Sequence, residues 1–161
     1  MDTLDKPYRI VLFQVFALGL IFIGPLLEKI FSVGFTLYST APIRLCFIAC
    51  CMTSCLYFLA AVLNLGKSLT PSPVPLAQSA LVTNGLYRFS RHPIYSALLF
   101  FPIGWIGFWQ SWVSLIGYAL LIIILLKKSK LEEQLLLERY GNPYKDYMRT
   151  VNRFLPSKKR Q

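Results

Sequence analysis

Three long runs without a formal charge constrain this chain more than any other feature of its sequence. They are Ile10–Leu27, Leu45–Leu65 and Ile94–Leu126, of 18, 21 and 33 residues. About 20 apolar residues in a helix cross the hydrocarbon core of a membrane. The whole chain of 161 residues is 55% hydrophobic, which is too apolar for an ordinary soluble domain. We therefore predict an all-α integral membrane protein, with residues 1–161 forming a single domain.

The first two runs are each long enough for one span, so we place two N-terminal spans within residues 1–65. The first run is long for the apolar part of a signal peptide. It is followed by Glu28 and Lys29 rather than by a small-residue cleavage site. We interpret it as a span that remains in the protein.

The third run is long for one helix and short for two full spans with a loop. Near its middle, Trp105, Trp109 and Trp112 cluster around Gln110 and Ser111, a composition typical of a membrane–water interface. This favours a tight helical hairpin over residues 93–126 with its tip at the far membrane face. The alternative, one long tilted helix, would leave the tryptophans in the middle of the bilayer.

The distribution of basic residues favours four spans over three. Of the 17 Lys and Arg residues, ten lie beyond residue 126. Four spans bring this basic end and the polar loop 66–92 to the same membrane face, whereas three spans would separate them. Because basic segments favour the cytoplasmic side, we expect both termini to be cytoplasmic. The net charge of +10 then reflects topology and contact with anionic membrane lipids, and we expect no nucleic-acid partner.

Residues 127–156 are expected to form cytoplasmic, amphipathic C-terminal helices. A first helix should continue to Gly141, a plausible C-terminal cap, and Asn142-Pro143 resembles the start of a second helix. Tyr144, Tyr147 and Val151 would share an apolar face of that second helix, which we expect to end at Pro156.

Cysteine and histidine usage gives no sign of a metal site. The four cysteines all fall within the second apolar run, where thiols usually serve as small apolar side chains, and the chain has a single histidine. The four cysteines are Cys46, Cys50, Cys51 and Cys55.

A polar stretch from Gly85 to Tyr95 immediately precedes the third apolar run. Pro93 disfavours a helical conformation for His92 and suits the first position of a helix, so a helix should begin there. Its first turn would direct free amide groups towards Arg91 and His92, which creates a corner that favours an anion. The alternative is that these two side chains only anchor a membrane helix at the interface.

A second polar cluster, Lys128, Lys130, Glu132 and Glu133, follows the third run. On a helix the Lys128–Glu132 and Lys130–Glu133 spacings permit two solvated ion pairs, which is the simplest interpretation. The four-span topology, however, brings this cluster to the same membrane face as Arg91.

Together these motifs resemble a known family. The chain contains Gly85-Leu-Tyr-Arg, then Arg91-His-Pro-Ile-Tyr95, and some forty residues later Glu132-Glu133 followed by Tyr140-Gly141 and a segment running to Pro156. This pattern resembles the isoprenylcysteine carboxyl methyltransferase family, which is similar in turn to the membrane phospholipid N-methyltransferases. The resemblance covers residues 81–156.

The resemblance implies a membrane enzyme that uses S-adenosylmethionine, with residues 66–92 as a cytoplasmic cofactor loop. It implies catalytic roles for Lys128, Glu132 and Arg91. Lys128 lies where these enzymes have an arginine that binds the substrate, and Ala97 stands where the family usually has glycine. The cofactor contacts implied by the resemblance are Leu81, Val82, Tyr87, His92, Pro93, Ile94, Tyr95 and Glu132.

Three functions remain open at this stage. The first is O-methylation of the carboxylate of a lipophilic, isoprenylcysteine-like substrate that enters from the bilayer. A carboxylate is ionised at neutral pH and needs a cation to hold it, and basic residues crowd this site. The second is N- or S-methylation of a phospholipid or small molecule. An amine acceptor would need a base such as Glu132 or Glu133 to take its proton. The third is a non-catalytic membrane scaffold.

We expect a multi-pass protein of a prokaryotic inner membrane. The terminal Lys158-Lys159-Arg160-Gln161 also has the form of a dilysine retrieval signal, which leaves the endoplasmic reticulum as the alternative.

Overall fold

The computed structural model describes residues 2–35, 40–74 and 80–155, with side chains from residue 8 onward. The described residues form helices and one isolated parallel bridge, between Ser90 and Asn152. The elements are α1 (Asp2–Ile30), α2 (Ala41–Leu65), η1 (Gly66–Ser68), η2 (Gly85–Arg88), α3 (Pro93–Trp109), α4 (Trp112–Tyr140) and α5 (Asn142–Thr150). The all-helical prediction is therefore confirmed for this part of the chain.

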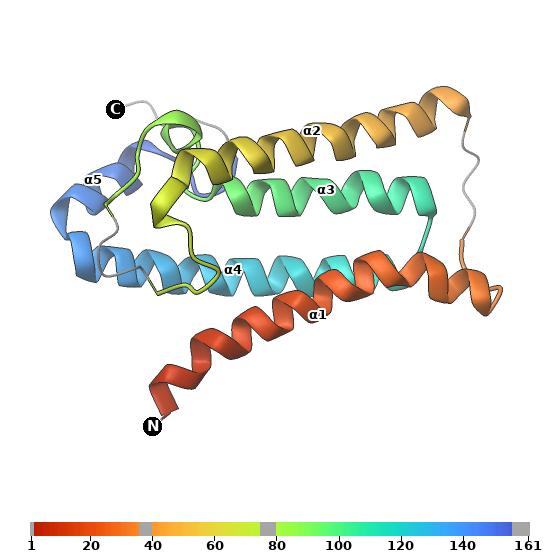
Figure 1. Cartoon of the computed structure of the whole chain (residues 1–161), viewed down its shortest axis with the longest axis horizontal. Coiled ribbons are helices and arrows are strands. Elements are labelled where there is room, and N and C mark those ends of the chain that lie inside the picture. Colours follow the sequence, from red (N-terminus) through yellow and green to blue (C-terminus); the bar gives the residue numbers. More distant parts are fainter. Residues whose placement is uncertain (1, 36–39, 75–79, 156–161) are drawn as a thin grey trace.

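The four long helices pack as two pairs, α1 along α4 and α2 along α3, with smaller contacts between α3 and α4. Figure 1 shows α1 diverging from α4 towards its N-terminus. The C-terminal end of α1, the N-terminal end of α2 and the turn from α3 to α4 lie at one end of the bundle (Figure 1). The segment before α3, helix α5 and the N-terminus lie at the other end (Figure 1). The described residues 66–74 and 80–92 of the loop and the C-terminal helix thus share one end, as the charge distribution predicts.

Three helical segments are long and apolar enough to cross a membrane, judged by length and composition: Tyr8–Ile30, Ala41–Ser68 and Trp112–Tyr140. Helix α3 is apolar but has only 17 residues. It ends at Trp109 with Gln110 in the left-handed region, and α4 begins at Trp112 after Ser111, whose hydroxyl accepts a hydrogen bond from the Ser114 amide. The turn of the predicted hairpin is therefore at Gln110 and Ser111.

A proline in α1 helps to fix this helix against the hairpin. Pro25 has no amide hydrogen to donate to the carbonyl of Ile21, four residues earlier. That carbonyl instead accepts hydrogen bonds from Trp105 Nε1 at 2.9 Å and from Ser114 Oγ at 2.7 Å. Because an unsatisfied carbonyl is costly in an apolar environment, the two side chains stabilise α1 where it meets α3 and α4.

Helices α2 and α3 are held together by close packing. A Cβ atom at Gly104 of α3 would lie 2.6 Å from the carbonyl oxygen of Phe47 and 2.8 Å from Cys51 Sγ on α2. Cys50 and Cys51 direct their thiols at carbonyl oxygens of α3, each at 3.7 Å. The second apolar run therefore uses these two cysteines at a helix–helix contact.

The predicted boundaries of the C-terminal helices need one correction. Gly141 ends α4 with a positive φ of 60°, but Asn142 is already the first residue of α5. Helix α5 ends at Thr150, so the prediction that it reaches Pro156 was wrong. The chain leaves the helix because residues 151–154 run beside residues 90–92 and accept backbone hydrogen bonds from them. Pro156 itself lies outside the described residues, as do residues 75–79 of the loop.

Candidate functional site

A cavity of about 490 Å³ lies at the end of the bundle that carries the loop and α5. Its walls come from α1, α2, the loop before α3, the first turn of α3, the last turns of α4, and α5. Such a volume suits a small ligand. Nearly all of the sequence-predicted site residues line it: Leu81, Val82, Tyr87, Arg91, His92, Ile94, Tyr95, Lys128 and Glu132. Pro93 is buried as the first residue of α3 and is not among the lining residues.

The segment before α3 is fixed by a contact with α2. Gly85 opens η2 with a φ of 56°, and a Cβ atom there would lie 1.7 Å from Asn64 Oδ1. The Asn64 side chain accepts a hydrogen bond from the Leu86 amide at 2.7 Å. Glycine is therefore required at this turn, both by the conformation and by the close approach of Asn64. His92 then adopts a non-helical conformation with φ −129° and ψ 62°, and α3 begins at Pro93 as predicted.

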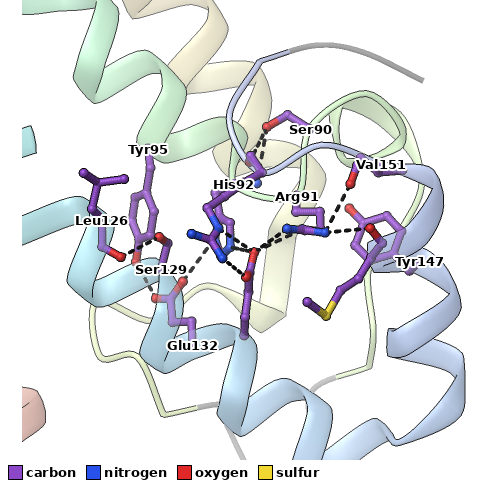
Figure 2. A network of polar contacts seen from close by, with 12 residues as sticks. Ser90, Arg91, His92, Tyr95, Leu126, Ser129, Glu132, Tyr147 and Val151 are labelled. Carbon is purple, nitrogen blue, oxygen red and sulfur yellow. Dashed lines mark hydrogen bonds and ion pairs between the residues drawn. The ribbon is translucent and has the colours of Figure 1, made fainter. Parts of the chain in front are cut away.

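Glu133 is the centre of the polar network at the base of the site. It accepts hydrogen bonds from Arg91 Nε at 3.0 Å, from Arg153 Nε at 3.0 Å and from His92 Nε2 at 3.2 Å. The side chains of Arg91 and Glu133 are only 8% and 5% exposed. Figure 2 shows Arg91 and His92 at the centre of this network of polar contacts. Glu133 thus links α4 to the start of α3 and to the C-terminal segment, residues 151–154.

His92 lies between two carboxylates of α4. Its Nδ1 is 3.3 Å from Glu132 Oε2, while its Nε2 faces Glu133 (Figure 2). Burial lowers the pKa of His92, but the hydrogen bonds and charges of Glu132 and Glu133 outweigh this effect and raise the pKa above its usual value. The ring also stacks on Tyr95 with a centroid distance of 5.3 Å. The two carboxylates therefore favour the charged form of His92, and together with Tyr95 they hold its ring in the wall of the site.

The C-terminal segment closes the site from outside the bundle. The amides of Arg91 and His92 donate to the carbonyls of Asn152 and Arg153 at 2.9 and 3.0 Å. Arg91 Nη1 donates to the carbonyl of Met148 at 2.8 Å. In addition, the Tyr147 hydroxyl donates to the Tyr87 carbonyl. The guanidinium of Arg91 thus also links the segment before α3 to the C-terminal end of α5. The same side chain lines the cavity.

Lys128 is a buried cation on the cavity wall. It is 3% exposed, and its Nζ donates to Gln14 Oε1 at 2.8 Å and lies 5.3 Å from the centre of the Tyr95 ring. The solvated intrahelical ion pairs that the spacing permits do not form within the described residues. Glu132 there pairs with His92 and accepts from the Tyr95 hydroxyl, and Lys128 has no ion pair.

Tyr144 of α5 adds an unsatisfied donor to the site. It is 1% exposed and lines the cavity, yet its hydroxyl has no hydrogen-bond partner within the described part of the chain. Burial raises the pKa of this phenol, so the hydroxyl stays protonated. A buried hydroxyl without a partner is unusual and indicates a position where a ligand completes the hydrogen bonding.

Two lining residues carried no predicted role in the site. Gln14 was overlooked within the first apolar run, although it is the one carboxamide among the 18 residues from Ile10 to Leu27. Tyr144 was assigned only to an apolar docking face. Arg153 falls in the segment running to Pro156 that ends the recognised pattern, but its contact with Glu133 depends on the path of residues 151–154 and had no local signal.

Comparison with known proteins indicates the family to which the chain is related. A family model described as phospholipid methyltransferase matches residues 43–143, more than half of the chain. A protein-S-isoprenylcysteine O-methyltransferase of Dictyostelium discoideum is 34% identical over 82 residues, which cover 44% of this chain and 30% of that protein. Probable protein-S-isoprenylcysteine O-methyltransferases of indica and japonica rice are 31% identical over 80 residues, covering 49% of this chain and 42% of theirs. The chain thus matches less than half the length of these curated relatives.

Proposed function

Because this chain belongs to the phospholipid methyltransferase family, we propose that it is a membrane methyltransferase that uses S-adenosylmethionine and methylates the carboxylate of a lipophilic, isoprenylcysteine-like acceptor. The observation that carries the choice of acceptor is Lys128. It is a buried cation on the cavity wall, and it has no ion-pair partner among the described residues. A buried charge is costly unless a counter-charge compensates it, so the site favours an anionic ligand.

The residues present fit the proposed cofactor. The cavity offers aliphatic and aromatic wall for an adenine at Leu81, Val82 and Tyr87, and a carboxylate for ribose hydroxyls or an ammonium group at Glu132. The Tyr144 hydroxyl supplies a donor that otherwise has no partner among the described residues. When bound, S-adenosylmethionine supplies an electrophilic methyl group on a sulfonium sulfur.

The start of α3 suits the anionic end of that cofactor. Pro93 begins the helix, so the amides of its first turn lack intrahelical acceptors and the positive end of the helix dipole points towards His92. Ile94 and Tyr95 of this turn line the cavity together with His92. We assign them, with Pro93 as the residue that begins the turn, to holding the aminoacyl carboxylate.

The acceptor is assigned to the part of the cavity between the long helices. Apolar side chains of α1, α2 and α3 form this wall and would contact a hydrocarbon tail arriving from the bilayer, while the Lys128 ammonium holds the carboxylate. The apolar side chains of this wall are Val11, Val15, Leu18, Phe58 and Leu98. Methyl transfer is an in-line displacement, so the chain mainly has to align the acceptor oxygen and exclude water. Arg91 acts through Glu133, by keeping the site assembled.

A second acceptor class has one observation in its favour. Glu132 lines the same cavity one helical turn from Lys128, and a carboxylate there can take the proton that an amine must lose. Product chemistry separates the two classes, because mild base cleaves a methyl ester and leaves an N-methyl group intact.

In the cell we assign the protein to a prokaryotic inner membrane, with the site and both termini at the cytoplasmic face. The clustering of basic residues at the site end of the chain supports this orientation.

The experiment is calorimetric binding of S-adenosylmethionine to the purified protein, followed by methylation of N-acetyl-S-farnesylcysteine with base-release analysis of the product. We expect binding and a base-labile ester. We expect Glu132→Gln to weaken cofactor binding, with Glu138→Gln, an exposed change on the same helix, as the matched control. If the folded wild-type protein bound no S-adenosylmethionine, the proposal would be refuted.

A further inference from the structure

Gln14 is a polar side chain placed where the sequence otherwise avoids polarity. It is the single carboxamide in the uncharged run of α1, on a helix that is long and apolar enough to cross a membrane. Placing a carboxamide in such a helix costs free energy unless the group is hydrogen-bonded, so we expect it to have a partner and a role. Gln14 lines the cavity and accepts a hydrogen bond from Lys128 Nζ at 2.8 Å.

The chemistry of this pair determines what it can offer a ligand. A lysine ammonium only donates hydrogen bonds, so the carboxamide oxygen of Gln14 must face it. The amide nitrogen of this cavity-lining side chain carries two further hydrogens and has no hydrogen-bond acceptor among the described residues. The ammonium also retains donors beyond the one given to Gln14. Side by side, the two groups therefore present N–H donors to the cavity and no acceptor.

We propose that Gln14 and Lys128 together form a two-donor clamp for the carboxylate of the acceptor, so that α1 supplies a residue that recognises the acceptor. This inference rests on the proposed methyltransferase function and extends it to a residue outside the family match at residues 43–143. The clamp favours an anion with two oxygens, because a carboxylate can accept from both groups at once.

The surroundings of the clamp support a carboxylate attached to an apolar chain. Val11 and Leu18 lie three and four residues from Gln14 along α1, Val15 is next to it, and all three line the same cavity. The neighbouring carboxylate of Glu132 is already engaged by His92 and by the Tyr95 hydroxyl. The clamp thus places a polar head group beside an apolar wall on the same helix.

The substitution Gln14→Glu separates recognition from structure. The introduced carboxylate keeps an acceptor for Lys128, so the link between α1 and α4 persists and a purely structural role would be preserved or strengthened. The same change removes the two amide hydrogens and adds a negative charge next to the acceptor carboxylate. Recognition is lost while the helix contact remains.

The test uses the full-length protein in detergent, with N-acetyl-S-farnesylcysteine as the probe and its carboxamide as the uncharged counterpart. We expect Gln14→Glu to raise the KM for the probe on the order of a hundredfold, and Gln14→Leu about tenfold, with S-adenosylmethionine affinity unchanged. In equilibrium binding, the preference of the wild-type protein for the carboxylate over the carboxamide should vanish in Gln14→Glu. The matched control is Gln134→Glu, the same chemical change at an exposed position of α4.

Lowering the pH gives an internal rescue. As the new carboxyl group becomes protonated, the ratio of variant to wild-type KM should fall back towards the value for Gln14→Leu.

The outcomes distinguish this inference from the function on which it rests. A wild-type protein that binds S-adenosylmethionine and methylates the probe, with a Gln14→Glu variant of unchanged KM, would overturn the clamp and leave the proposed function standing. A Gln14→Glu variant that methylates phosphatidylethanolamine vesicles better than the wild-type protein would overturn the clamp too, since the acceptor group would then be a cation. Failure of the wild-type protein to bind cofactor or to methylate the probe would overturn both.

Discussion

Replacing Glu133 with glutamine tests whether the network at the base of the cavity holds the site together. The carboxylate accepts from Arg91, His92 and Arg153, which come from the segment before α3 and from the C-terminal segment. Glutamine has nearly the same shape but no charge, and its amide hydrogens would face donors. The change therefore leaves the guanidinium groups of Arg91 and Arg153 close together, next to His92, without their shared counter-charge.

The magnitude follows from the burial of the partners. Removing one member of a buried ion pair typically costs about 3–5 kcal/mol. Arg91 is nearly buried, with 8% of its side chain exposed, whereas Arg153 is 29% exposed and keeps part of its hydration. We therefore expect the lower end of that range, about 3 kcal/mol of lost unfolding free energy. Glu132→Gln should cost clearly less, because Glu132 faces one cationic side chain in the ion pairs described here.

The assay is equilibrium unfolding in detergent micelles, comparing wild type, Glu133→Gln, Glu132→Gln and the exposed control Glu138→Gln. The control should stay within about 0.5 kcal/mol of wild type. A loss of less than about 1 kcal/mol for Glu133→Gln would refute the reasoning, since that is the range of an exposed ion pair. Equal losses for the two glutamate variants would refute the division between a structural Glu133 and a ligand-facing Glu132.

Two further predictions concern pH and packing. Because the pKa of His92 is raised in the folded protein, its imidazolium contributes stability that is fully present below about pH 6.5 and is lost as the pH rises through the folded value. Unfolding from about pH 6 to about pH 9 should therefore show wild type losing stability relative to His92→Gln, and a gain with rising pH would contradict this. Gly104→Ala should destabilise the protein by about 1–3 kcal/mol, because its Cβ would lie 2.6 Å from the Phe47 carbonyl oxygen of α2. Gly19→Ala, where nothing lies within 4 Å, is the matched control and should be neutral or stabilising in the same unfolding assay.

Local sequence signals were sufficient for the positions of the elements. Uncharged apolar runs of fixed length predict the long helices, and the tryptophans around Gln110 and Ser111 predict the turn of the hairpin. Pro93 predicts the start of α3 because a proline restricts both its own conformation and that of the residue before it. The end of α5 was placed too far along the chain, since its termination at Thr150 depends on hydrogen bonds with residues distant in sequence.

The sequence predicted which polar residues form the site, but it did not predict the role of each one. The motif around His92 and the glutamate pair on α4 were visible as polar residues next to apolar runs, and the charge distribution predicted that they meet at one end of the bundle. Which glutamate would serve structure and which would face the cavity was not decided by their spacing. Glu132 and Glu133 are adjacent in the chain, and the approach of Arg91 and Arg153 to Glu133 distinguishes their roles.

The sequence by itself determined an all-helical membrane protein, the positions where its helices begin and turn, and the polar groups available for a reaction, because hydrophobic length, proline and charge act within a few residues of where they stand. The tertiary structure alone decided that Gln14 of α1 meets Lys128 of α4, that Tyr144 reaches the cavity without a partner among the described residues, and that Arg153 returns to Glu133. The two contacts join residues 20 and 114 positions apart, so they depend on helix packing that no local pattern encodes. The burial of the Tyr144 hydroxyl depends on the same packing.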